Sequence, residues 1–406
     1  MSRPPEAMYS PNTLNTLIGQ GVDAIDTPAL VVDLDAMERN LQRMAQFAQQ
    51  HRMRWRPHAK MHKSAQIGLM QMQAGAVGVC VQKTAEAEAM AAGGVNDIHI
   101  SNEVIAPHKL ARVAALARQL QSRGGRLGIA VDSEQGVQAL ADAVRAIGPA
   151  AATSSAPLID VYVEVDVGHG RCGIPPAQAG ALAQRVASHA GLRLAGLQAY
   201  QGRAQHLHSV QERRDAIAAA ADAVAQARTA IEALGLPVPC VTGAGTGTMV
   251  HESATGAWHE LQVGSFLFMD ADYRRNERDA GQPPFEPALF VKSQVTGRYP
   301  QHAVCDAGHK SHAIDSGMPE VHWPAGLDYF SGGDEHGVLR VRSGGPANAG
   351  DSTLPALPAI GDIVWLIPGH CDPTVNLHDA MIGVRGGLQV GVVERIIPVD
   401  ARGALT

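Results

Sequence analysis

Short hydrophobic runs alternate with amphipathic stretches over residues 54–265. The amphipathic stretches show the spacing of helices, as in Ala106–Ser122, Pro176–His189 and Val210–Leu234. The hydrophobic runs predict eight strands: Arg54–Lys60, Gly78–Gln82, Asp97–Asn102, Leu127–Ser133, Val161–Val167, Leu194–Tyr200, Val238–Gly243 and Glu260–Ser265. Strands that alternate with helices favour βαβ units and a parallel sheet. Eight repeats predict an α/β fold closed into a (β/α)8 TIM barrel, although a doubly wound open sheet fits the same pattern.

The pattern changes after residue 277. Helical spacing disappears, and short apolar runs stand among many glycines and prolines: Leu289–Val295, Ala303–Ala307, Val338–Val341, Ile363–Ile367 and Gly391–Ile397. Such runs predict a β-rich second domain. An early strand, Pro28–Leu34, precedes the helix Asp35–His51, and we assign it to the same domain. The predicted organisation is a barrel over residues 36–277 and a β domain built from residues 1–35 and 278–406.

Composition excludes several classes of protein. The 406 residues include 33 basic and 39 acidic side chains, a net charge of -6, so no nucleic-acid partner is expected. Five widely spaced cysteines do not suggest a disulfide framework, which favours a reducing cytoplasm. Residues 1–25 lack a basic start followed by an apolar core, and no run of about 18 apolar residues occurs, so neither a signal peptide nor a membrane span is expected.

Lys60 ends the first predicted barrel strand. Chemistry in a (β/α)8 barrel lies at the C-terminal strand ends, and a phosphate typically binds after strands seven and eight. The basic neighbours Arg56, His58, His62 and Lys63 make the surroundings of Lys60 cationic. A cationic, partly dry setting lowers the pKa of a lysine, and the neutral amine attacks aldehydes. Lys60 is therefore a candidate Schiff-base former, although a lone lysine is usually a solvated surface group.

Two turns rich in glycine and hydroxyl groups follow strands seven and eight. Their candidate phosphate-binding residues are Thr242, Gly243, Gly245, Thr246, Gly264 and Ser265. Glycines allow backbone N–H groups to approach an anion closely. Either turn alone could be an ordinary glycine turn. Both at the expected strand ends, on the same face as a lysine, predict a site for pyridoxal 5'-phosphate (PLP).

Gly168–Gly173 matches the G-x-G-x-x-G pattern between a strand and a helix. A dinucleotide site would also need an acidic residue about 20 positions later, at the end of the next strand. That strand ends in Gln198-Ala199-Tyr200, without a carboxylate. We therefore disfavour a nicotinamide cofactor and expect this loop to carry Arg171 into the mouth of the barrel.

The β domain contains the sequence His370-Cys371-Asp372. In an extended chain residues i and i+2 share a face, so His370 and Asp372 would point together and Cys371 away from them. One imidazole and one carboxylate suit Mn²⁺ or Mg²⁺ better than a thiolate-rich zinc site does. The alternative is a polar surface loop. His206, just past strand six, could reach the barrel mouth.

At these motifs the chain closely resembles the bacterial D-threonine aldolases, PLP enzymes of the alanine-racemase type (fold type III). The resemblance covers residues 26–395 and rests on five motifs in chain order: Pro57–Lys60, Asp166–Gly173, Thr242–Gly247, Asp334–Gly337 and His370–Asp372. It implies a PLP-binding barrel of alanine-racemase type with a β domain. It also implies a homodimer whose site lies near the subunit interface.

The resemblance implies a role for several single residues. Lys60 would form the Schiff base with PLP. Arg171 would lie near the phenolic oxygen of the cofactor, and Tyr200 beside its ring. His206 would accept a proton. Relatives carry a histidine directly after the tyrosine, where this chain has Gln201, which affects contacts near the ring but not Lys60.

His370 and Asp372 would bind the divalent metal. The related D-serine dehydratases resemble this chain too, but they carry H-x-C at this site. Here Cys371 occupies the middle position and Asp372 the ligand position. This arrangement favours an aldolase over a dehydratase.

The implied reaction cleaves D-threonine, or another D-3-hydroxy-α-amino acid, to glycine and an aldehyde. The metal would lower the pKa of the β-hydroxyl, His206 would remove its proton directly or through water, and PLP would take up the electrons of the broken Cα–Cβ bond. Two alternatives stay open. One is a metal-dependent dehydratase of the D-serine or 3-hydroxyaspartate type, and the other is a non-catalytic PLP carrier, which needs no metal pair.

Overall fold

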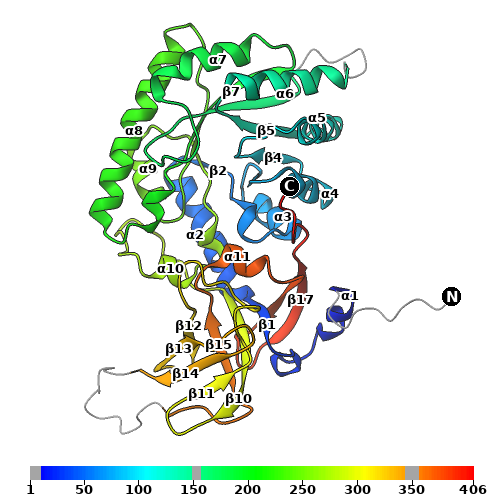
Figure 1. Ribbon diagram of the computed structural model, residues 1–406, viewed down its shortest axis with the longest axis vertical. Helices are drawn as coiled ribbons and strands as arrows, with labels where there is room; N and C mark the ends of the chain where they lie inside the picture. Colours follow the sequence, from blue (N-terminus) through cyan, green and yellow to red (C-terminus); the bar gives the residue numbers. More distant parts are fainter. Residues whose placement is uncertain (1–10, 149–156, 343–355) are drawn as a thin grey trace, which may run out of the picture. The chain divides into compact units, whose positions relative to one another are not determined.

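The computed structural model describes residues 11–148, 157–342 and 356–406. Its chain forms two compact units (Figure 1). The barrel unit comprises Arg43–Gly264, Asn276–Pro283 and Gly403–Thr406, and the β unit comprises Met1–Gln42, Ser265–Arg275 and Pro284–Arg402. No helix within the described ranges is both long enough and apolar enough to cross a membrane.

Eight parallel strands form the sheet of the barrel unit, in the spatial order β2-β9-β8-β7-β6-β5-β4-β3. They are β2 (Arg54–Trp55), β3 (Val79–Val81), β4 (Asp97–Ile100), β5 (Arg126–Val131), β6 (Ile159–Glu164), β7 (Leu192–Ala199), β8 (Val241–Gly243) and β9 (Glu260–Leu261). A bridge between His58 and Cys80 joins the two ends of this order, and the Cys80 amide donates to the Pro57 carbonyl at 2.8 Å. The sheet therefore closes on itself. The predicted TIM-like barrel is confirmed, and the open sheet is not.

Helices cover the outer face of these strands, as Figure 1 shows for α5, α6 and α8. The helices of the unit are η3 (Ala59–Met61), α3 (Ala65–Gln73), α4 (Thr84–Ala92), α5 (Pro107–Ser122), α6 (Glu134–Ala146), η4 (Pro176–Gln178), α7 (Ala179–Ala187), η5 (Arg203–His206), α8 (Val210–Glu232) and α9 (Met249–Thr255). Each long helix buries one apolar stripe. In α5 the stripe includes Leu110, Val113 and Leu120, and this helix packs on β5. The strands are consequently buried on both faces, which is why they form nearly continuous apolar runs in the sequence.

The β unit contains a nine-stranded sheet with the order β13-β14-β11-β10-β1-β16-β17, in which β15 pairs with β10 and β12. Its strands are β1 (Ala29–Asp33), β10 (Leu289–Arg298), β11 (Ala303–Cys305), β12 (Glu320–Trp323), β13 (Leu327–Ser331), β14 (Gly337–Val341), β15 (Ile363–Ile367), β16 (Ala380–Arg385) and β17 (Val392–Pro398). The early strand β1 pairs with β10 and β16, so it belongs to this sheet as expected. Buried Phe290, Trp365 and Ile382 contribute to its core.

Short helices complete the β unit: α1 (Pro11–Leu14), η1 (Asn15–Leu17), η2 (Val22–Ala24), η6 (Ser265–Leu267), α10 (Ala271–Arg274) and α11 (Cys371–Val375). The longer helix α2 (Leu34–Gln50) starts in this unit and continues into the barrel unit. The Asp33 carboxylate caps the first turn of α2 by accepting hydrogen bonds from the amides of Asp35 and Ala36. Such a cap satisfies amides that have no partner within the helix.

Candidate active site

Lys60 lies on a single 3-10 turn, η3 (Ala59–Met61), just after β2. Pairing with the neighbouring strand continues beyond β2, because the His58 amide donates to the Val263 carbonyl at 3.0 Å. The chain then turns, so the predicted strand Arg54–Lys60 extends too far at its C-terminal end. Ala59 and Met61 are buried, whereas Lys60 is partly exposed. The turn thus anchors Lys60 through its neighbours at the C-terminal end of the strand, as expected from the barrel rule.

His58 holds this turn in place. Its Nδ1 accepts a hydrogen bond from the Lys60 amide at 3.3 Å. The hydrogen of the neutral ring must then be on Nε2, which lies 3.1 Å from Ser101 Oγ, an oxygen that can accept it. Burial lowers the pKa of His58 well below its usual value, and the nearby Lys60 lowers it further. His58 is therefore a neutral group that positions the backbone of Lys60.

The loop after β8 is tightly packed around its glycines. A Cβ on Gly243 would lie 2.1 Å from the Ala199 carbonyl oxygen, and a Cβ on Gly245 would lie 2.3 Å from Gln205 Oε1. The same Gln205 oxygen accepts a hydrogen bond from the Gly247 amide at 3.0 Å. Gln205 is buried and fixes the loop, a role that the sequence did not reveal.

The other predicted phosphate-binding residues are placed differently. The Thr242 hydroxyl donates to Glu260 Oε1 at 3.0 Å, inside the barrel. Gly264 is less constrained, because a Cβ there would lie at an ordinary contact distance, 3.4 Å, from the His58 carbonyl oxygen. Ser265 is buried and begins η6 in the β unit. Gly243 and Gly245 are therefore the positions where the chain leaves room only for a hydrogen.

Replacing Gly245 with valine is expected to weaken PLP binding by roughly 10- to 100-fold. The new side chain would displace Gln205, and the loss of its bond would leave the Gly247 amide unsatisfied at a cost of about 1–3 kcal/mol. PLP affinity can be measured by titration of the apoprotein. The matched control is Gly21→Ala, where the added Cβ meets open space. Unchanged affinity in folded Gly245→Val protein would contradict the predicted cradle.

The glycine loop after β6 carries Arg171 to the end of β7. Asp166 Oδ1 accepts hydrogen bonds from the amides of Gly168 at 2.9 Å and Gly170 at 3.0 Å, which fixes the loop. The Arg171 guanidinium carbon lies 5.9 Å from the centre of the Tyr200 ring, within range of a cation–π contact. Arg171 and Tyr200 are therefore brought together.

Gln201 and His206 follow Tyr200 but face different surroundings. Gln201 is buried; its side-chain amide donates to the Val167 carbonyl at 3.0 Å, and its oxygen accepts from the Arg203 amide at 3.2 Å. This residue thus connects the two loops. His206 ends η5 and is exposed to solvent, so it is accessible for proton exchange.

The structure brings together an acidic cluster at the strand ends, which the sequence analysis did not identify. Glu103, Asp132 and Cys172 each place one ligand-type atom within 4.8 Å of the others. Burial raises the pKa of the Cys172 thiol to about 11, and Glu103 adds to this effect. Burial, and next the charge of Glu103, also raise the pKa of Glu164. The raised pKa of Cys172 therefore disfavours a thiolate as a metal ligand here.

His370 and Asp372 lie together in the β unit, but not for the predicted reason. The segment is extended only at His370, the N-cap of the short helix α11, and Asp372 is in the first turn of that helix. His370 Nε2 faces Asp372 Oδ1 at 3.8 Å. Cys371 is buried, and its thiol donates to the Met269 carbonyl at 3.4 Å. The helical turn, rather than strand alternation, separates the thiol from the other two side chains.

Carboxylates surround the His370 ring. Its Nδ1 lies 2.6 Å from Asp315 Oδ2. Burial alone would lower the pKa of His370, but Asp372, Asp315 and Asp270 raise it above its usual value. Asp270 also caps α10 and accepts a hydrogen bond from the Cys371 amide at 3.0 Å. The site is therefore strongly anionic, which favours a bound cation.

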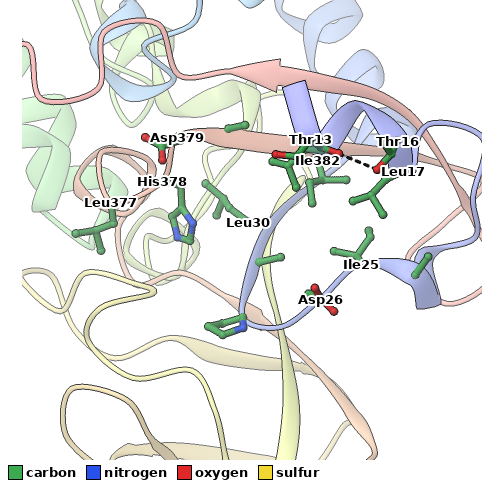
Figure 2. A pocket seen from close by; sticks show the side chains of 15 residues that line it. Thr13, Thr16, Leu17, Ile25, Asp26, Leu30, Leu377, His378, Asp379 and Ile382 are labelled. Atoms are coloured by element: carbon green, nitrogen blue, oxygen red, sulfur yellow. Dashed lines mark hydrogen bonds between the residues drawn. The ribbon is translucent and has the colours of Figure 1, made fainter. Parts of the chain in front are cut away.

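A cavity of about 290 Å³ lies elsewhere in the β unit, between the N-terminal segment and β16. Figure 2 shows Thr13, Thr16 and Leu17 on one side and Leu30 and Ile382 among the other lining residues. His378 also lines it, with Nε2 at 2.8 Å from the Ser311 carbonyl oxygen. The described lining contains none of the candidate site residues, so we do not include this cavity in the site.

Both parts of the chain match known protein families. The alanine racemase N-terminal domain family matches residues 32–272, and a serine dehydratase domain matches residues 288–384. The chain is 40% identical over 394 residues to a 3-hydroxy-D-aspartate aldolase of Paracoccus denitrificans (strain Pd 1222), covering 95% of each chain. It is also 40% identical over 387 residues to a D-threonine aldolase of Arthrobacter sp, again covering 95% of each. The crystal structure of D-threonine aldolase from Filomicrobium marinum is 43% identical, with a TM-score of 0.87, and the match covers 96% of this chain and 99% of that chain.

Proposed function

The chain belongs to the family of D-threonine and 3-hydroxy-D-aspartate aldolases, and from this membership we propose that it is a PLP- and divalent-metal-dependent carbon–carbon lyase. Its substrates would be D-threonine and other D-3-hydroxy-α-amino acids, which it cleaves to glycine and an aldehyde. The observation that carries this proposal is Lys60, a lysine at a barrel strand end whose backbone amide is held by His58. The same chain also brings His370 and Asp372 together in an anionic setting.

The barrel unit would hold PLP, which supplies an electron sink when bound. Lys60 would attach it covalently, and the loop at Gly243–Thr248 together with Gly264 would hold its phosphate. Arg171 and Tyr200, 5.9 Å apart, would lie at its ring. The residues fit this group because Lys60 lies just after a barrel strand and because Gly243 and Gly245 leave no room for a Cβ in the loop.

The β unit would hold the cation on His370 and Asp372. A gap of 3.8 Å between Nε2 and Oδ1 is too wide for a hydrogen bond. It is close to the roughly 3.0–3.6 Å that two neighbouring ligands of one ion take when each bond is about 2.1 Å. Nitrogen and oxygen donors suit Mn²⁺, or Mg²⁺, as the ion. A cation there would make the substrate β-hydroxyl easier to deprotonate, and the exposed His206 would accept its proton.

Product analysis tests the proposed reaction. Purified protein incubated with D-threonine, PLP and Mn²⁺ is expected to release glycine and acetaldehyde in equal amounts, because the Cα–Cβ bond is cleaved. A 2-oxo acid with ammonia would instead show the dehydratase reaction, and no product with either D-threonine or D-3-hydroxyaspartate would show a PLP carrier. Chromatography of the amino acids and an aldehyde assay distinguish these outcomes.

The remaining assignments belong to the proposal as well. We assign PLP binding to the domain at residues 36–277 and the metal to the domain formed by residues 1–35 and 278–406. A homodimer and a cytoplasmic location follow from the family resemblance and from the cysteine usage. The partner of the chain is then a small-molecule substrate, with neither nucleic acid nor membrane involved.

A further inference from the structure

We propose that Asp315 is a positioning residue for His370: it fixes the ring so that Nε2 presents its lone pair to the cation. This inference rests on the proposed metal role of His370 and Asp372. The contact that motivates it is the 2.6 Å distance between His370 Nδ1 and Asp315 Oδ2. No sequence pattern pointed to Asp315, which is 55 residues from His370.

A carboxylate can only accept a hydrogen bond, so Nδ1 must carry the hydrogen in this contact. In a neutral imidazole the other nitrogen, Nε2, is then unprotonated, and Nε2 is the atom that faces Asp372 at 3.8 Å. Histidine ligands of metals commonly donate their second ring N–H to a carboxylate, which sets both the tautomer and the ring orientation. Asp315 lies on the Nδ1 side and therefore does not compete with Asp372 for the ion.

Hydrogen bonds hold the Asp315 loop against α11. The Thr374 hydroxyl donates to the His370 carbonyl at 2.7 Å, and the Ala313 amide donates to the same hydroxyl oxygen at 3.1 Å. These two bonds connect the Asp315 loop, through Thr374, to the backbone of His370, the residue that Asp315 orients. The Ser316 hydroxyl adds a bond of 3.2 Å to Asp315 Oδ2.

Close packing and an arginine fix the loop on its other sides. A Cβ on Gly369 would lie only 2.1 Å from the Gly317 carbonyl oxygen, so the two segments can approach only because residue 369 is glycine. Arg275 donates to the Ser316 carbonyl at 2.7 Å and to Asp272 at 2.8 Å. The position of Asp315 is therefore set by the surrounding structure, although half of its side chain is exposed.

The test compares Mn²⁺ binding to the PLP-loaded wild-type protein and to Asp315→Asn. Free Mn²⁺ is counted by electron paramagnetic resonance, which does not depend on turnover. Loss of a carboxylate that orients a metal-binding histidine typically costs 10–100-fold in affinity. We expect Asp315→Asn and Asp315→Ala to bind Mn²⁺ about 10–100-fold more weakly. Saturating Mn²⁺ should restore most of the turnover, with PLP absorbance and melting temperature of the metal-free protein unchanged.

The matched control is Asp328→Asn, which removes an exposed carboxylate paired with Arg342 in the same unit. It should bind Mn²⁺ as the wild type does. Wild-type affinity in both Asp315 variants, with binding lost in His370→Ala, would overturn the positioning role and leave the proposed function intact. Failure of the wild-type protein itself to bind Mn²⁺ would instead count against the metal part of the proposed function.

Discussion

Replacing Lys60 with alanine is expected to abolish covalent attachment of PLP and to lower turnover on the order of 10³-fold or more. Lys60 is the lysine of the turn η3, and its backbone amide is held by His58. The nearby Lys63 cannot substitute easily, because it is buried and its ammonium group lies 3.3 Å from Glu86. A neutral amine and an unobstructed approach are both needed to attack the aldehyde of PLP.

Borohydride reduction followed by peptide mass spectrometry measures this attachment directly. The wild-type protein should yield one modified peptide, which contains Lys60, whereas Lys60→Ala protein should yield none. Lys310→Ala is the control, since Lys310 is exposed and pairs only at the surface with Glu335. Reduced PLP on any lysine of folded Lys60→Ala protein would show that the attachment site was wrongly assigned.

The barrel was predictable because its strands are covered on both faces. Such strands form continuous apolar runs, and their boundaries are marked by helices of regular spacing. The β unit was predicted less completely. Three of its strands, β12 (Glu320–Trp323), β13 (Leu327–Ser331) and β16 (Ala380–Arg385), were not identified. In β12 none of the four residues is buried, and β13 ends in two exposed residues, so neither presents an apolar run.

The residues of the candidate site were also predicted unevenly from the sequence. Position at a strand end did not by itself single out Lys60, because it would equally have selected Ser101, Asp132 and Glu164, each of which lies at or next to the end of a barrel strand. Asp315 gave no such signal, because it lies on a turn between strands and meets His370 only through the fold.

The segment at His370, which also contains Pro373, was predicted as extended. However, Pro373 lies in the first turn of α11, where a backbone N–H would have no hydrogen-bond partner within the helix, so its absence costs nothing. Proline is therefore compatible with this helix. The helical turn changes the geometric argument for the metal pair, although His370 and Asp372 still face each other.

Removing either member of the metal pair is expected to lower turnover by roughly 10³-fold, because Lewis-acid assistance to a departing proton is worth several kcal/mol. His370→Ala and Asp372→Ala should both lose the response to added Mn²⁺. EDTA should have the same effect on the wild-type protein, and Mn²⁺ should reverse it. PLP absorbance should persist in all three cases, since we assign the cofactor to the barrel unit.

Cys371→Ala provides the decisive comparison with these two variants. The thiol is buried and donates to the Met269 carbonyl, away from Asp372, so its loss should leave the Mn²⁺ response nearly unchanged. The expected cost is instead a small loss of stability, about 1 kcal/mol for one deleted buried atom. Turnover with graded Mn²⁺ and thermal unfolding of the same samples separate the two effects. If Cys371→Ala lost the metal while Asp372→Ala kept it, the ligands would be His370 and Cys371, and the dehydratase reaction would gain support over the aldol cleavage.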